Sequence, residues 1–191
     1  MKFRRRLQET QPSTVARRRH WCTLAPGIYR GNEMYRRILL AYDGTEEGVL
    51  ALREGALLAK QCCAQVVLLA VVPDTSGTRL AEGVYGGAVA QQIDTYRDLL
   101  GRAVTWLEAR GYNPIAKLVV GEPAPTIGAV AKEIDADLVV VSHHHQTFLS
   151  RWWSGSTDTY LSDHLGCTLL IARNPVTEDA FSAATQEVVE S

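Results

Sequence analysis

Apolar positions between residues 37 and 172 follow two periods in turn. Five short runs rich in branched side chains predict strands at 38–42, 66–72, 115–120, 138–141 and 168–172. Between these runs, apolar residues recur at three- and four-residue spacing, which predicts helices, and the clearest stripe extends from Val89 to Leu107. Strands that alternate with helices predict right-handed βαβ units, and so one parallel sheet with helices on both faces.

The two ends of the chain lack this pattern. Residues 1–33 carry eight Lys and Arg residues against Glu9 and Glu33, a net charge of +6, and we expect no packed structure there. Three hypotheses fit this segment: a basic arm that contacts nucleic acid or anionic lipid, an organelle-targeting leader, or an inert stretch upstream of a true start at Met34. Residues 175–191 are expected to form a flexible tail, which leaves one domain at 34–174.

Charge and cysteine content narrow the class of protein. The whole chain has a net charge of −1, so residues 34–191 carry −7, and we expect no nucleic acid partner for the domain. Cys22, Cys62, Cys63 and Cys167 show no metal-binding spacing and are expected to be reduced thiols of a cytoplasmic protein. No apolar stretch approaches the roughly 20 residues of a membrane-spanning helix, so no membrane partner is expected.

The segment 142–157 is the candidate ligand site. It follows the strand at 138–141, and parallel sheets bind ligands beyond the carboxyl ends of their strands. Ser156 or Thr157 is placed to cap the next helix, whose N-terminus would favour an anion. The histidines at 143–145 are not expected to bind a metal, because neighbouring side chains rarely converge and the segment contains no Asp, Glu or Cys. Protonated, they could instead contact a phosphate.

Catalytic motifs are not found in the sequence. It contains no nucleophile elbow, no Walker lysine motif and no carboxylate pair with acid/base spacing, so no catalytic residue is predicted.

Five motifs, in this order, resemble the universal stress protein family over about residues 34–174. They read RILLAYDGTEEG, LLAVVPD, VVGEPAPTI, DADLVVVSHH and LSDHLGCTLLIAR. The resemblance implies a Rossmann-like, three-layer α/β/α fold with a five-stranded parallel sheet in the order 3-2-1-4-5. It also implies a homodimer formed through the last strand, which comprises Thr168, Leu169, Leu170, Ile171 and Ala172 in this chain.

The resemblance also implies a nucleotide site, in a degenerate form. Members that bind ATP carry Gly, two residues, Gly, nine residues, then Gly and Ser or Thr. This chain has Ser142 and His145 at the first two glycines and keeps Gly155 and Ser156. Glycines let the backbone approach a phosphate, whereas the His145 side chain would occupy that space. His143 and Thr157 complete the candidate set in this segment.

Two further candidates come from the earlier strands. The resemblance implies that Asp43 contacts the adenosine end of a nucleotide and that Val71 lines the adenine. From the residues alone, Asp43 equally fits a turn or a helix cap, and Val71 fits the core of the sheet.

Three functions therefore compete. The first is a cytoplasmic, dimeric stress-response module without catalysis, which acts through unknown protein partners. The second is a sensor that binds ATP or another adenine nucleotide, the sole candidate cofactor, and the third is a slow ATP hydrolase.

Overall fold

The computed structural model describes residues 34–73, 86–142, 161, 163–173 and 176–186. Within these ranges the predicted alternation of strands and helices is confirmed. The strands are β1 (Arg37–Ala41), β2 (Gln65–Pro73), β3 (Ile115–Gly121), β4 (Leu138–Ser142) and β5 (Thr168–Ala172). The main helices within these ranges are α1 (Glu46–Gln61), α3 (Gly86–Glu108), α4 (Pro123–Glu133) and α6 (Glu178–Gln186).

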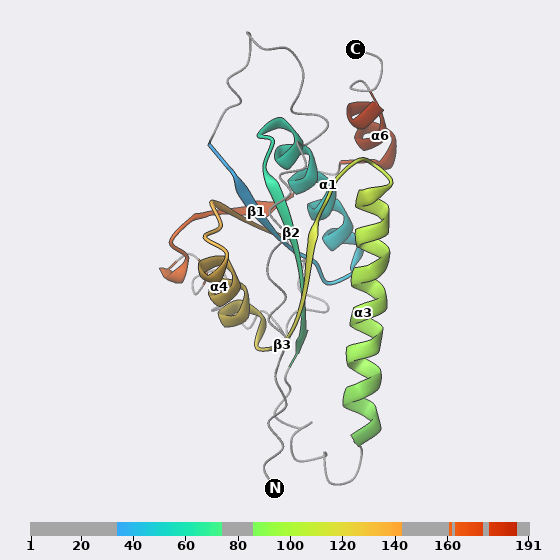
Figure 1. The fold of residues 1–191 in the computed structure, drawn as a ribbon, viewed down its shortest axis with the longest axis vertical. Helices are drawn as coiled ribbons and strands as arrows, with labels where there is room; N and C mark the ends of the chain where they lie inside the picture. Colours follow the sequence, from blue (N-terminus) through green and yellow to red (C-terminus); the bar gives the residue numbers. More distant parts are fainter. Residues whose placement is uncertain (1–33, 74–85, 143–160, 162, 174–175, 187–191) are drawn as a thin grey trace, which may run out of the picture.

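The five strands form one parallel sheet in the order β3-β2-β1-β4-β5, as predicted (Figure 1). The chain starts at the centre with β1, moves outward to β2 and β3, and then crosses back to β4 and β5 on the other side. The direction of winding therefore reverses between β1 and β4. In sheets of this kind, that reversal opens a crevice at the carboxyl ends of the two strands.

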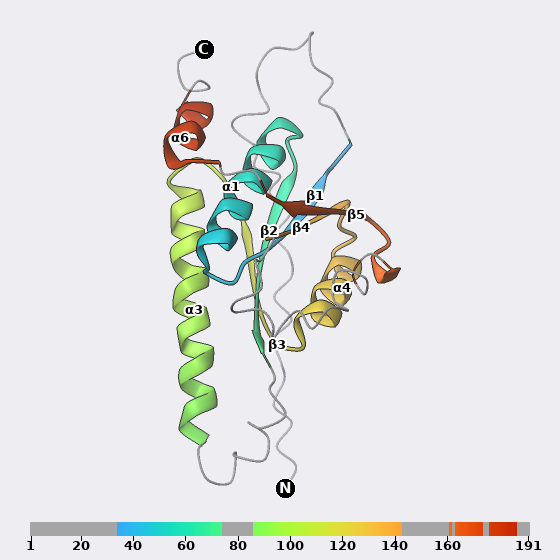
Figure 2. The ribbon, with the colours of Figure 1, turned by 180° about the vertical axis from the view of Figure 1, so that it is seen from behind.

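The two faces of the sheet bury different partners (Figures 1 and 2). Because side chains alternate along a strand, Ile38 and Leu40 face α1 and α3, whereas Leu39 faces the layer that contains α4. The stripe predicted on α3 packs as expected, since Leu100, Ala103 and Leu107 are all buried. The three-layer α/β/α class is thus confirmed.

Helix α4 begins two residues after β3 ends. Its first residue is Pro123, whose fixed φ suits the first turn and whose missing N–H would have had no partner inside the helix. The helix expected after Thr157 is seen only in part: Leu161, Asp163 and His164 are helical, and 158–160 and 162 lie outside the described residues.

The expected flexible tail from residue 175 onward is wrong for residues 178–186, which form α6. Phe181 is fully buried against the rings of Trp106 and Tyr112. The sequence pattern missed this helix because a single large apolar side chain, surrounded by alanines and polar residues, produces no sustained period.

Two further expectations concern cysteines and membranes. Cys62 and Cys167 are free, as predicted, but Cys63 is disulfide-bonded, so the expectation of four reduced thiols is wrong there. No helix in the described ranges is long and apolar enough to cross a membrane. The basic segment 1–33 lies outside the described residues.

Candidate functional site

Two of the predicted site residues flank the reversal of winding between β1 and β4. Asp43 follows β1, and Ser142 is the last residue of β4. The register pairs Leu40 with Val140, so the chain leaves both strands at the same edge of the sheet. The fold therefore brings Asp43 and Ser142 to one edge, although 98 residues separate them in sequence.

Asp43 organises the start of α1. Its Oδ1 accepts hydrogen bonds from the backbone N of Thr45 at 3.1 Å and from Thr45 Oγ1 at 2.8 Å. Thr45 is the N-cap, because its Oγ1 in turn accepts from Gly48 N at 3.0 Å. The turn interpretation of Asp43 is thus confirmed, with Thr45 rather than Asp43 as the capping residue.

Two glycines make room for this arrangement. A Cβ on Gly48 would lie 2.2 Å from Asp43 Oδ1, so glycine lets the carboxylate sit against the first turn of α1. Gly44 has a φ of +79°, and a Cβ there would lie 2.0 Å from Leu99 Cδ1 on α3. The Asp43 carboxylate is therefore held against the first turn of α1, while Leu99 of α3 packs against the adjoining Gly44.

Tyr42 and Tyr96 share the electrostatic environment of Asp43. Burial raises the pKa of both hydroxyls, and the negative charge of Asp43 raises each pKa further, with Arg102 opposing the rise at Tyr42. Both phenols therefore stay neutral at physiological pH and can donate or accept hydrogen bonds. From the sequence, Tyr96 was only one position in the apolar stripe on α3. Its hydroxyl group, in a stripe that is otherwise apolar, was the one feature that could have pointed to a role in the site.

Val71 lies in the core of the sheet. Its side chain is 4% exposed and belongs to the aliphatic cluster beneath α4, together with Leu69, Ile127 and Val141. This is the sheet-core role considered from the sequence. Contact between Val71 and an adenine ring stays a prediction.

Ser142 is the sole buried polar residue among those described, with 7% of its surface exposed, and it pairs with Ala172 of β5. The other candidates in this segment lie outside the described residues: His143, His145, Gly155, Ser156 and Thr157.

The predicted dimer strand, β5, is at the edge of the sheet, next to β4. Thr168 is exposed, Leu169 to Ile171 are half-buried and Ala172 is buried. An edge strand of this kind presents backbone groups and apolar side chains that another strand can cover.

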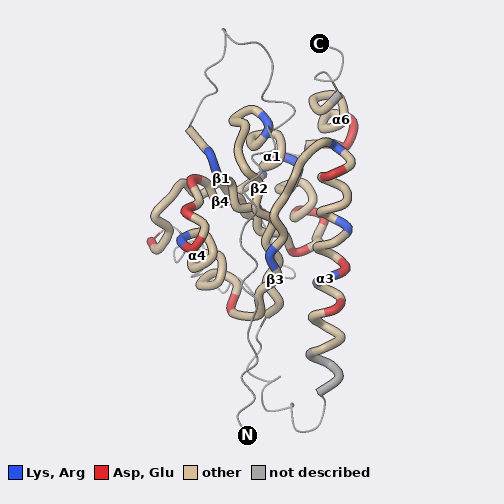
Figure 3. Tube along the Cα trace, in the orientation of Figure 1, with Lys and Arg blue, Asp and Glu red and all other residues tan. Residues whose placement is uncertain are grey.

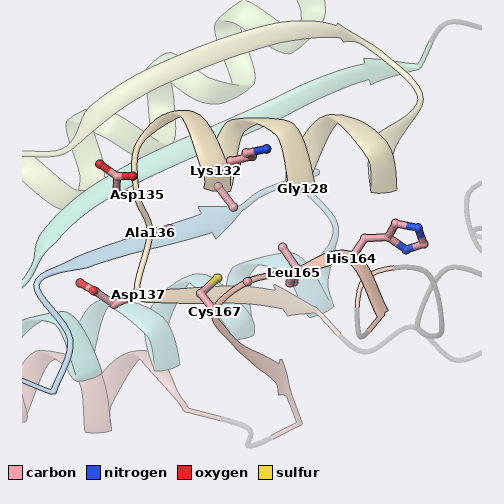
Figure 4. Close-up of a pocket in the computed structure, with 10 residues that line it drawn as sticks. Gly128, Lys132, Asp135, Ala136, Asp137, His164, Leu165 and Cys167 are labelled. Carbon is pink, nitrogen blue, oxygen red and sulfur yellow. The ribbon is translucent and has the colours of Figure 1, made fainter.

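A cavity of about 520 Å³ lies at the opposite, amino edge of the sheet (Figure 4). Its lining includes Lys132, Asp135, Asp137, His164 and Cys167. Figure 4 shows Asp135 and His164 at opposite ends of it, so the charged groups do not converge. Burial and the charge of Asp137 both raise the pKa of Cys167, which keeps the thiol protonated and a poor nucleophile.

In the part of the chain that the structure describes, no group of three His, Cys, Asp or Glu side chains is placed to hold a metal ion. The described residues place a fixed carboxylate, two neutral phenols and the end of β4 at the carboxyl edge.

A doubly wound parallel sheet of this order defines a class of α/β proteins, which hold ligands beyond the carboxyl ends of their strands. Within that class, the model of the universal stress protein family matches residues 34–173. The chain therefore belongs to the universal stress protein family.

Known relatives are distant but span the same domain. Universal stress protein Sll1388 of Synechocystis is 26% identical over 73% of this chain and 99% of its own length. A universal stress protein solved in complex with cAMP is 22% identical, with a TM-score of 0.55 over 73% of this chain and 98% of its own. The universal stress protein of Archaeoglobus fulgidus, in complex with dAMP, is 20% identical, with a TM-score of 0.55 over 73% of this chain and 99% of its own.

Proposed function

We propose that this protein is a non-catalytic stress-response module that binds an adenine nucleotide in the crevice between β1 and β4. The observation that carries the proposal is the placement of Asp43 and Ser142 on the two sides of the reversal of winding. The fold already holds an adenine nucleotide in two similar proteins, one solved with cAMP and one with dAMP.

The Asp43 carboxylate suits the adenosine end of such a ligand. A carboxylate accepts hydrogen bonds from ribose hydroxyls, and the start of α1 holds this one in place before a ligand arrives. A carboxylate whose position is already fixed loses little conformational entropy on binding, which favours affinity. A phosphate would repel Asp43, so the phosphate end of the ligand points away from β1, toward the segment that follows Ser142.

The phosphate end is the weaker half of the proposed site. Ser142 and His145 occupy positions where ATP-binding members carry glycine, while Gly155 and Ser156 keep the last part of the motif. We expect this replacement to favour ligands with few phosphates, because side chains take up room that a triphosphate needs. AMP or ADP should accordingly bind at least as well as ATP.

The module acts as a cytoplasmic homodimer in this proposal. The support is the position of β5 at the edge of the sheet and its half-buried apolar side chains. In a dimer joined through β5, the neighbouring β4 would bring the two crevices close to the shared interface.

Native mass spectrometry after gentle purification tests the proposal. We expect the intact chain to carry a noncovalent mass equal to AMP, ADP or ATP, at a stoichiometry of one per subunit. Asp43→Asn keeps an oxygen that can accept from Thr45 but removes the charge, so the copurified nucleotide should fall while the fold is kept. Wild-type protein without nucleotide, even after incubation with millimolar AMP, ADP and ATP, would contradict the proposal.

A further inference from the structure

Helix α6 lies beyond the residues that the family model matches, which end at 173. It is seated on α1 and beside the C-terminal end of α3, on the face of the sheet away from α4 (Figures 1 and 2). The surface that holds α6 therefore belongs to the family domain, while the helix that occupies it is an addition to that domain.

The first element of this surface recognises a carboxylate. Glu178, in the first turn of α6, lies between two guanidinium groups: Arg53 Nη2 is 2.7 Å from Oε2, and Arg110 Nη2 bonds Oε1. Along the Cα trace, the acidic start of α6 lies beside basic positions near the end of α3 (Figure 3). Arg53 also donates from Nη1 to the carbonyl of Val176 at 3.2 Å. The arginine side chains are only 17% and 24% exposed, so this double hydrogen bond is partly shielded from water.

The same contacts act on the protonation of Glu178. Burial raises its pKa, but the hydrogen bonds and positive charges of Arg110 and Arg53 lower it by more, so the pKa lies below its ordinary value. Glu178 is therefore ionised at neutral pH.

The second element recognises an aromatic ring. Phe181 is fully buried, with its ring centroid 4.8 Å from that of Trp106 and 6.3 Å from that of Tyr112. The slot is held in shape from outside α6, because Tyr112 donates to the carbonyl of Ala56 at 3.0 Å and Arg110 lies 4.1 Å over the Trp106 ring. A flat ring thus enters a slot whose walls belong to α1 and α3 and the turn after α3.

The third element recognises the end of a helix. Lys60 Nζ donates to the carbonyls of Ala184 and Thr185, each at 3.0 Å. A cation at a helix C-terminus is favourable for the dipole and satisfies carbonyls that the helix itself leaves open. Together the three elements recognise a short helix. It has an acidic residue, an aromatic ring three residues later, and a C-terminus about one turn after the ring.

Helix α6 is too short to be stable on its own. The helix has nine residues, and isolated helices shorter than about 12 residues are marginal in water. Phe181 is its sole fully buried side chain among those described. Undocking would therefore be a local opening of the structure, which needs less free energy than global unfolding.

The surface also continues past α6. A hollow of about 760 Å³ along α3 is lined by Trp106 and Arg110, which the α6 site shares, and extends to Arg97, Asp98 and Arg102. A helix longer than α6 would find further charged side chains of both signs there.

We propose that Arg53, Lys60, Trp106, Arg110 and Tyr112 form a docking groove for a helix of a partner protein that presents a carboxylate and, three residues later, an aromatic ring. Helix α6 occupies this groove in the free protein, and a partner helix of this kind displaces it. The charge of the groove and the slot for a ring both select such a helix.

A fluorescently labelled peptide of residues 176–186 is the probe, titrated against the full-length chain by fluorescence anisotropy. In wild type the groove is occupied by α6, so the peptide should bind weakly. Phe181→Ala removes the ring that holds α6 and leaves the groove intact, so the peptide should bind at least tenfold more tightly. A peptide whose own Phe is replaced by Ala should not bind, and Arg110→Ala added to Phe181→Ala should abolish binding.

Two controls keep the result decisive. Circular dichroism establishes that Phe181→Ala is folded, and Glu178→Gln, which keeps the ring, serves as the release variant if it is not. Equal affinity for wild type and the folded release variant, or equal binding of both peptides, would overturn the proposal. Light scattering tests whether α6 of a second copy occupies the groove instead. If wild type is a dimer and Phe181→Ala is a monomer, the copies exchange α6, and the proposal of a partner helix is overturned.

Discussion

Two aspartates at opposite ends of the sheet illustrate how the fold divides stability from binding. At the amino edge, Asp137 Oδ2 accepts from the backbone N of Arg36 at 2.7 Å and of Arg37 at 2.8 Å. The Asp137 backbone carbonyl also accepts from Thr168 N at 3.2 Å, so this residue joins β1, β4 and β5. At the carboxyl edge, the bonds from Thr45 to Asp43 stay within one turn.

The difference follows from the topology. Strands β1, β4 and β5 begin side by side at the amino edge, and an aspartate there can hold them together. At the carboxyl edge, between β1 and β4, the direction of winding reverses, which is where sheets of this kind hold a ligand crevice. We therefore expect substitutions near Asp137 to change stability and substitutions near Asp43 to change ligand binding.

The largest effect is expected for Asp137→Ala. It removes the acceptor of two backbone N–H groups and should lower the free energy of unfolding by about 2 kcal/mol, measured in urea, since hydrogen bonds to charged groups contribute about 1.5–3 kcal/mol. Nucleotide affinity should not change. Asp98→Ala, on the exposed face of α3, is the control and should stay within about 0.5 kcal/mol of wild type. Weaker nucleotide binding by Asp137→Ala would contradict the claim that the amino edge determines stability and the carboxyl edge determines binding.

Gly48→Ala tests the position of the Asp43 carboxylate without removing its charge. The new Cβ would lie 2.2 Å from Oδ1, so the carboxylate must move. We expect nucleotide affinity to fall about tenfold, which corresponds to about 1.4 kcal/mol, in a calorimetric titration. Gly101→Ala is the matched control, because a Cβ there meets no atom within 4 Å, and it should stabilise α3 by about 0.5–1 kcal/mol. Wild-type affinity in Gly48→Ala would show that the position of this carboxylate is unimportant.

Ser142→Gly combined with His145→Gly tests the phosphate end of the same site. Restoring glycine at both positions should strengthen ATP binding several-fold, because space returns near the phosphates. The preference for AMP over ATP should therefore become smaller. The measurement is the ratio of ATP to AMP dissociation constants. A ratio unchanged from wild type would contradict the steric argument.

Acid should lower the free energy of unfolding by protonating Asp137, and we expect this to be the smallest of the effects. Burial raises its pKa, but hydrogen bonds from the Arg37 and Arg36 backbone and their positive charges lower it below the ordinary 3.8. A lowered pKa means that this contribution to stability is complete above pH 3.8 and is lost as the pH falls through the folded value. The difference in unfolding free energy between wild type and Asp137→Ala should therefore shrink below that pH. A constant difference down to pH 2 would contradict it.

Local and repeating features of the sequence predicted most of the fold. Strand runs and the α3 stripe depend on period alone, and the parallel sheet follows from their alternation; the strand order came from the family motifs. Helix α6 was missed because its stability comes from contacts with Arg53, Trp106 and Arg110, which are distant in sequence. The sequence named Asp43 and Ser142, which the fold brings to one edge of the sheet, whereas Tyr96 comes near Asp43 only through the packing of α3 on the sheet.

Calorimetric titration of the wild-type chain and Asp43→Asn with AMP, ADP and ATP tests the central claim most directly. We predict a saturable heat in wild type, with a dissociation constant below about 1 mM, and at least tenfold weaker binding in Asp43→Asn at unchanged stability. No heat in wild type up to millimolar nucleotide, or equal affinity in the two proteins, would contradict a nucleotide site built around Asp43.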